Sequence, residues 1–241
     1  PFAGSAAVLL ARPAFADRRV ETLNDADGWL VNAWRAIRSR PAEVAEHAHG
    51  PVTEIDYHAR LAWLQERRTD GLRSWLEGDP EVCDTKAAGW WLYVLACGIG
   101  DPWGPGPWRV IDGRLTDTRA LPHLGDAGRG VNREMPHLGD AGRGVLAAYL
   151  ARIAERLTRV RITCGDWARV VTPSVTRAGT GGDGSRAVFL DPPYATSGDL
   201  YAHVDIHVAT AVRAWCVTAP ADLRIVPVSY THLTLPTIYS V

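Results

Sequence analysis

The chain has 241 residues, of which 46% are hydrophobic and 22% charged, and its formal net charge is −1. This is the composition of an ordinary globular protein, and because no run of 18 apolar residues occurs, a membrane-spanning segment is not expected. The cysteines show no C-x-x-C spacing, so we expect free thiols and a cytoplasmic protein. They are Cys83, Cys97, Cys164 and Cys216.

The first fifty residues predict an α/β pattern. A turn of small residues in 1–6 leads into an apolar segment with helical character, which runs to residue 12. Residues 18–25 then predict a short strand that ends in acidic residues. Residues 27–40 carry apolar side chains at the spacing of an amphipathic helix, which Pro41 terminates.

The pattern becomes helical between residues 51 and 121. Residues 57–78 and 84–100 predict helices, and a loop rich in proline and glycine follows from Asp101. Six of the ten tryptophans lie between residues 63 and 108, which indicates that most of them form the core of a helical insertion.

A ten-residue repeat, PHLGDAGRGV, occurs at 122–131 and again at 136–145. It lies in a mildly basic stretch, since residues 101–170 contain eleven arginines against eight acidic residues. Two copies are too few for a solenoid. The repeat is either a local duplication in a surface loop or a flexible cationic loop that follows a phosphate backbone.

Strand–helix alternation returns after the repeat. Residues 144–159 predict a helix, and the strand that follows ends in the acidic turn around Asp166. Further strands are expected at 186–194 and 223–229, with a helix at 200–217 between them. We therefore expect residues 1–50 and 146–228 to form one discontinuous domain, interrupted by an insertion at 51–145.

The sequence FLDPPY, residues 189–194, ends the strand expected at 186–194. Proline lacks a backbone donor and has a fixed φ, so two prolines in a row stop the strand and leave Asp191 at its tip. Tyr194 lies just beyond. A carboxylate and an aromatic ring on a stiff turn are typical of a functional site, although the tetrapeptide DPPY also occurs as an ordinary turn.

Together, PFAGSAAVLL at the start and FLDPPY resemble DNA adenine methyltransferases of the D12 class, especially phage-like members. The resemblance extends over residues 1–227 through four further segments: VETLNDADGWLVN, RVRITCGDW, PHLGDAGRGV and CDTKAAGWWLYVLACGIG. It implies a Rossmann-like α/β sheet that binds S-adenosylmethionine, with a mainly helical target-recognition insertion at 51–145. The implied reaction is methyl transfer to the N6 amino group of adenine in DNA. Cytosine N4 and RNA adenine enzymes use close variants of the motif.

The resemblance also implies roles for individual residues. The target amino group would donate hydrogen bonds to Asp191 and the Pro192 carbonyl, while Tyr194 would stack on a base flipped out of double-stranded DNA. Asp25 would accept from ribose hydroxyls, with Glu21 as a competitor, and Asp166 would accept from the cofactor adenine. The catalytic set is Asp191, Pro192, Pro193 and Tyr194. The cofactor set is Pro1, Phe2, Ala3, Gly4, Ser5, Ala6, Asp25, Asp166 and Trp167.

Other observations concern Ala6, the histidines and the ends of the chain. The family has glycine at the position of Ala6, so a positive φ there would strain the alanine by about 1 kcal/mol. His203 and His207 are four residues apart on a predicted helix, but no third ligand is evident and no metal is expected. We expect a monomer that is a fragment of an enzyme from a phage or a restriction-modification system. It would lack the strand before the first turn, and residues 229–241 would be a non-native tail. A DNA-binding fragment without activity is the alternative.

Overall fold

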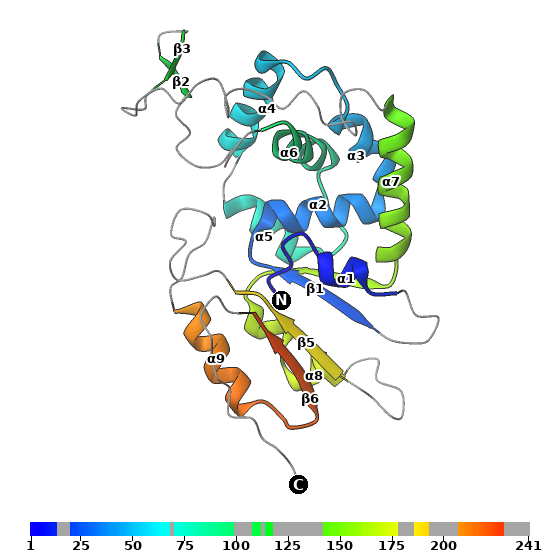
Figure 1. Ribbon diagram of the computed structural model, residues 1–241, viewed down its shortest axis with the longest axis vertical. Coiled ribbons are helices and arrows are strands. Elements are labelled where there is room, and N and C mark those ends of the chain that lie inside the picture. Colours follow the sequence, from blue (N-terminus) through cyan, green and yellow to red (C-terminus); the bar gives the residue numbers. More distant parts are fainter. Residues whose placement is uncertain are drawn as a thin grey trace. The chain divides into compact units, whose positions relative to one another are not determined.

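The structure is a computed structural model that describes residues 1–13, 20–67, 70–98, 108–111, 114–117, 142–177, 186–192 and 207–228. The chain divides into two compact units (Figure 1). Unit 1 consists of Pro1–Asp27 and Arg159–Val241, and unit 2 is Gly28–Thr158.

Unit 1 contains two pairs of parallel strands and several short helices. The strands are β1 (Glu21–Asp25), β4 (Val160–Cys164), β5 (Arg186–Leu190) and β6 (Leu223–Pro227). The helices are α1 (Ala7–Ala11), the 3₁₀ helix η1 (Trp167–Val170), α8 (Pro173–Arg177) and α9 (Val208–Thr218). β1 pairs with β4, and β5 pairs with β6. Parallel partners need a crossover connection, which α9 contributes between β5 and β6.

The β1–β4 pair is in register from Glu21 opposite Val160 to Asp25 opposite Cys164. Alternate residues of β4 are buried, as expected for a strand with one face in the core. Both strands therefore end at the same edge, which places the acidic end of β1 beside the turn that follows β4.

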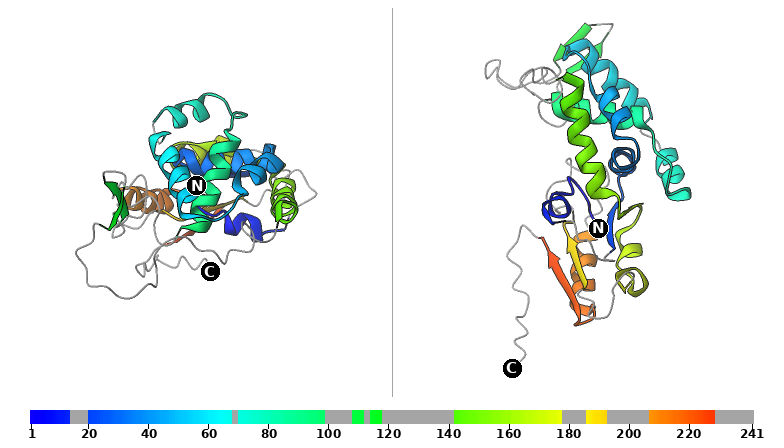
Figure 2. Two further views of the ribbon diagram at one scale, coloured as in Figure 1. Left: turned by 90° about the horizontal axis from the view of Figure 1, so that it is seen from above. Right: turned by 90° about the vertical axis from the view of Figure 1, so that its right-hand side faces the viewer.

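The β5–β6 pair forms the second part of unit 1, with α9 packed against it (Figure 2). Its core consists of Val171, Val188, Leu190, Val212 and Leu223. Arg186 begins β5 with its side chain buried and forms an ion pair with Asp222. The apolar side chains of β5 and α9 that meet in this core therefore explain why this part of the sequence forms a strand and a covering helix.

Unit 2 is mainly helical. Its helices are α2 (Gly28–Ser39), α3 (Pro41–Ala48), α4 (Glu54–Arg67), α5 (Asp70–Gly78), α6 (Thr85–Cys97) and α7 (Gly142–Leu157). α2, α3 and α4 pack on α6, and α7 packs on α2 and α3 (Figure 1). An antiparallel hairpin, β2 (Trp108–Ile111) and β3 (Arg114–Asp117), completes the described part of the unit.

Buried polar side chains connect these helices. The side-chain amide of Asn32 donates from Nδ2 to the Asp84 carbonyl at 2.9 Å, and its Oδ1 accepts from the backbone amide of Asp84 at 2.7 Å. These two bonds attach α2 to the start of α6. Asp84 in turn caps α6 by accepting from the Ala87 amide. Arg35 is also buried, and it donates from Nη1 to the carbonyls of Leu76 and Asp79 at the end of α5.

Several predicted elements differ from the observed ones. The segment predicted as helical at 57–78 is two helices, α4 and α5. The loop predicted after Asp101 contains the hairpin β2–β3, and α3 and α8 were not predicted. Unit 2 also extends beyond the predicted insertion at 51–145 on both sides, because α2, α3 and α7 pack with α6 or with one another. The Rossmann-like sheet and the functional division of the chain stay predictions, since two separate strand pairs neither establish nor exclude them.

Candidate functional site

The candidate site is built around the turn of residues 2–6. Phe2, Gly4 and Ala6 have φ angles of 57°, 48° and 53°, so three of these five residues are left-handed. The turn closes through the Ala6 amide, which donates to the Ala3 carbonyl at 2.8 Å, and Ala6 is the N-cap residue of α1. Ala6 is therefore held at a positive φ, at a cost of about 1–2 kcal/mol.

Two hydrogen bonds fix this turn to the end of β1. The Ala3 amide donates to the Asn24 carbonyl at 3.0 Å, and the Gly4 amide donates to Oδ2 of Asp25 at 3.3 Å. A Cβ placed on Gly4 would meet no atom of the described residues within 4 Å, so none of them fills the space beside the turn. Ser5 is exposed next to it, and Pro1 is half-buried.

Asp25 occupies the centre of these contacts. Its Oδ1 accepts from the Asp27 amide at 2.9 Å, and its carbonyl accepts from the Gly165 amide at 2.8 Å. Burial raises the pKa of the Asp25 carboxyl above its ordinary value of 3.8, although the hydrogen bonds from Asp27 and Gly4 oppose that shift. Each carboxylate oxygen keeps a further lone pair with which it can accept from a ligand hydroxyl.

Glu21, the competing acid, lies at the opposite end of β1. Its carboxylate forms an ion pair with Arg12 at 3.7 Å. It is four positions before Asp25 on the strand, a distance of about 13 Å at the usual rise per residue. The geometry therefore favours Asp25 as the acid beside the turn.

Aromatic rings line the side of the turn that faces β5. The ring of Phe2 lies 6.2 Å from that of Trp167, and Trp167 lies 6.1 Å from Trp215 in an edge-to-face arrangement. All three rings pack against the buried cluster that contains Leu190. Asp166, which precedes Trp167, is exposed and caps η1 by accepting from the Ala168 amide at 2.7 Å.

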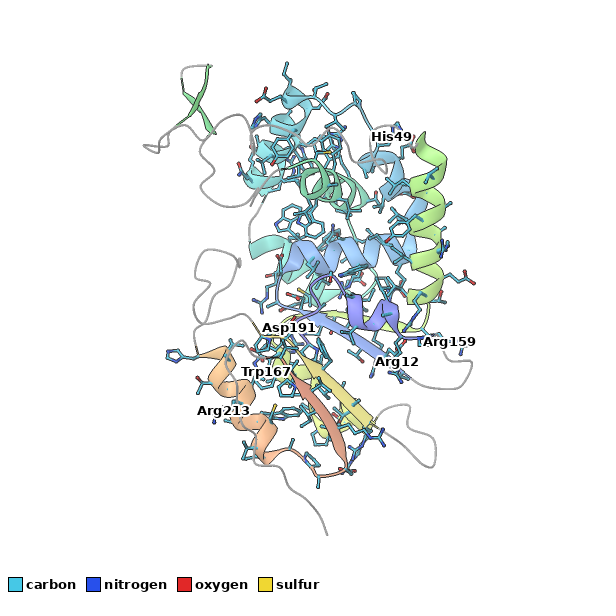
Figure 3. All side chains as sticks on the ribbon, in the orientation of Figure 1. Arg12, His49, Arg159, Trp167, Asp191 and Arg213 are labelled. Carbon is cyan, nitrogen blue, oxygen red and sulfur yellow. The ribbon has the colours of Figure 1, made fainter. Side chains whose placement is uncertain are left out.

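Asp191 and Pro192 follow directly on Leu190, the last residue of β5. The Asp191 side chain is exposed, whereas Pro192 is buried. The Val228 amide donates to the Leu190 carbonyl at 2.7 Å, which fixes the end of β5 against the end of β6. Trp167 packs against the cluster that contains Leu190, so Asp191, labelled in Figure 3, follows directly on a residue of that cluster. Pro193 and Tyr194 lie outside the described residues.

Residues that sequence reasoning did not identify support the site. Asn24 is buried; its amide donates to the Gly165 carbonyl at 3.1 Å and accepts from the Thr163 hydroxyl at 2.9 Å. Gly165 has a φ of 129°, a conformation that favours glycine. The glycine in CGDW was the available signal, since a glycine between a strand and an acidic turn commonly marks such a backbone.

Metal-binding groups and membrane-spanning helices can be sought only among the residues that the structure describes. Among the residues that the structure describes, no three His, Cys, Asp or Glu side chains are grouped so that they could hold a metal ion. His207 precedes α9, and His203 lies outside the described residues. Within the same residues, no helix is long and apolar enough to cross a membrane.

The arrangement brings together a strained small-residue turn, a half-buried acid, an exposed acid beside an indole ring and the exposed Asp191 at a strand end. These groups offer carboxylate acceptors and aromatic surface to a polar, ring-containing ligand. Comparison of the sequence with models of known protein families gave no match, and comparison with curated proteins gave no match either.

Proposed function

We propose that this chain transfers a methyl group from S-adenosylmethionine to the N6 amino group of adenine in DNA. The observation that carries the proposal is that the turn of Phe2–Ala6 is hydrogen-bonded to Asp25, while Phe2 and Trp167 pack against the cluster that ends at Leu190, next to Asp191. Residues from three distant parts of the sequence are thus brought together, which supports the proposal.

The residues of the turn fit the cofactor chemically. The space beside Gly4, which none of the described residues fills, leaves room for a ligand to approach the backbone, and Asp25 has the acceptor capacity for ribose hydroxyls. Asp166 is exposed and can accept from an exocyclic amino group, with the edge-packed Trp167 beside it. When bound, S-adenosylmethionine supplies an electrophilic sulfonium methyl group.

Asp191 and Pro192 have the remaining roles. The adenine amino nitrogen is a poor nucleophile because its lone pair is delocalised into the ring. Asp191 and the Pro192 carbonyl would accept its two N–H groups and favour a tetrahedral nitrogen whose lone pair points at the methyl group. The exposed position of Asp191 is compatible with a base that has left the duplex.

Cofactor binding is the first test. Thermal unfolding with increasing S-adenosylmethionine should show saturable stabilisation, about 2.7 kcal/mol at a concentration 100-fold above Kd. Asp25→Asn should weaken this effect, and Glu21→Gln, which changes the acid paired with Arg12, should leave it unchanged. A melting temperature that is independent of S-adenosylmethionine would contradict the proposal and favour a DNA-binding fragment without activity. Methylation of cytosine N4 or of RNA would instead point to a related enzyme.

A further inference from the structure

Three cationic side chains of α4 and α6 are held on the faces of aromatic rings. On α4, Arg60, Trp63 and Arg67 lie at the spacing i, i+3 and i+7. On α6, Lys86, Trp90 and Tyr93 lie at i, i+4 and i+7. These spacings place each set along one face of its helix, and the two helices pack together. We call these six residues the cation–aromatic ridge.

The contacts within the ridge alternate between cation and ring. Nζ of Lys86 lies 5.0 Å from the Trp63 ring centroid and 4.4 Å from that of Trp90, and these two rings meet edge to face at 4.9 Å. Cζ of Arg67 lies 3.9 Å over Trp63. Each distance is within the range of a cation–π interaction, so the rings restrict the freedom of these long side chains.

Arg60 forms the inner part of the ridge. Its Cζ lies 3.8 Å over the buried Tyr93 ring and 5.8 Å from the Trp90 centroid. A Cβ on Gly50 would lie 2.6 Å from Nη2 of Arg60, so a larger residue there would require this guanidinium to shift. Nη1 is buried and has no hydrogen-bond acceptor among the described residues. The positive charge is therefore enclosed without a bonded carboxylate.

The carboxylates near the ridge do not neutralise it. Lys86 and Arg60 form no ion pair in the part of the chain that the structure describes, and Arg67 has only its neighbour Glu66 at 3.8 Å, with both side chains largely exposed. Asp84, just before Lys86, is used to cap α6, and Asp56 accepts from the Thr53 hydroxyl. A partly exposed group of cations that rings hold in place is suited to an anionic partner.

We infer that the cation–aromatic ridge binds the phosphodiester backbone of duplex DNA, without reading its sequence. The cation–π contacts cover ring faces, so the ridge offers charge rather than surfaces on which bases could stack. Pre-ordered cations lose little side-chain freedom when they meet phosphates, whereas a free lysine or arginine must be ordered on binding. The choice of DNA as the polyanion rests on the proposed function, which this inference deepens. The ridge itself belongs to unit 2, and its binding is tested without methyl transfer.

Salt dependence of binding gives the test. Anisotropy of a labelled duplex, measured over a series of salt concentrations without cofactor, should give affinity that falls as salt rises. Lys86→Met should weaken binding to duplexes of different sequence equally and reduce the slope of log K against log salt by about 0.9, the value for one phosphate contact. Arg40→Met removes the same charge from an exposed, ion-paired site of unit 2 and should leave the slope unchanged.

Lys86 is the only lysine of the chain, which permits a second measurement. A duplex that carries an aldehyde should form an imine with the Lys86 amine and release water, and borohydride should then reduce the imine to a stable cross-link. Lys86→Arg should keep the affinity and salt slope but lose the cross-link. Circular dichroism and melting temperature establish that each variant is folded.

Four outcomes would overturn the inference. They are the absence of DNA binding, equal salt slopes for Lys86→Met and Arg40→Met, a cross-link that persists in Lys86→Arg, and tighter binding of single-stranded RNA than of the duplex. Failure of the proposed methyl transfer is distinguishable from failure of this inference, because Lys86-dependent DNA binding would then persist while no methylated product formed.

Discussion

The Gly4 amide donates a hydrogen bond to the carboxylate of Asp25 at 3.3 Å, although 21 residues separate them in the sequence. The same carboxylate accepts from Asp27, so one acid orders both the first turn of the chain and the exit from β1. Protonation of the Asp25 carboxylate should therefore affect both the geometry of the turn and the binding of any ligand there.

The first prediction is that Asp25 lowers stability as pH rises above 3.8. Burial raises its pKa in the folded state, so between 3.8 and that raised value the folded protein holds more protons than the unfolded one. Its stabilising contribution is therefore present at low pH and is lost as pH rises through the raised pKa. Urea unfolding of the wild type and of Asp25→Asn across this pH range checks the sign. A wild type that gains stability over Asp25→Asn as pH rises would contradict it.

Ala6 provides a second prediction. Replacement by glycine relieves a left-handed alanine, worth about 1–2 kcal/mol. It also frees the unfolded chain and removes a buried methyl group, which together cost about 1–2 kcal/mol. Ala6→Gly should therefore be nearly neutral in the free energy of unfolding. Ala36→Gly, at a buried helical position of α2, should cost about 1.5 kcal/mol or more. Equal losses in both variants would show that Ala6 is not strained.

The third prediction concerns the contact between α3 and α6. A Cβ on Gly89 would lie 2.4 Å from Cβ of His47 and 2.7 Å from the Val44 carbonyl oxygen. Gly89→Ala should therefore force the helices apart and cost about 1–3 kcal/mol. A Cβ on Gly78, at the end of α5, would meet none of the described residues, so Gly78→Ala should be neutral or slightly stabilising. Chemical denaturation distinguishes them; a neutral Gly89→Ala would contradict the observed packing.

Local patterns predicted most of the elements but not their pairing. The apolar run before Asp191 and the two prolines correctly indicated a strand that ends at Leu190. The strand expected before the acidic turn at Asp166 is likewise observed as β4. The pairing of β1 with β4 joins segments more than 130 residues apart, and no local pattern of side chains specifies such a partner.

The missed elements have identifiable causes. Pro41 was interpreted only as the end of a helix, but it is also the first residue of α3, where its fixed φ suits a helix start. The hairpin β2–β3 was missed because prolines and glycines precede Trp108, and these residues favour a loop. Gly165 is hydrogen-bonded to both Asn24 and Asp25, and these contacts arise only once β1 and β4 are paired.

The most direct measurement is methyl transfer from labelled S-adenosylmethionine to unmethylated duplex DNA, with the product nucleosides separated by mass spectrometry. The account predicts N6-methyladenine, and a loss of about 100-fold or more in rate for Asp191→Asn, because one acceptor for the target amino group is weakened. Glu21→Gln should retain the wild-type rate. Formation of N6-methyladenine at an undiminished rate by Asp191→Asn, or no methylated nucleoside from a wild type that is folded and binds DNA, would contradict the account.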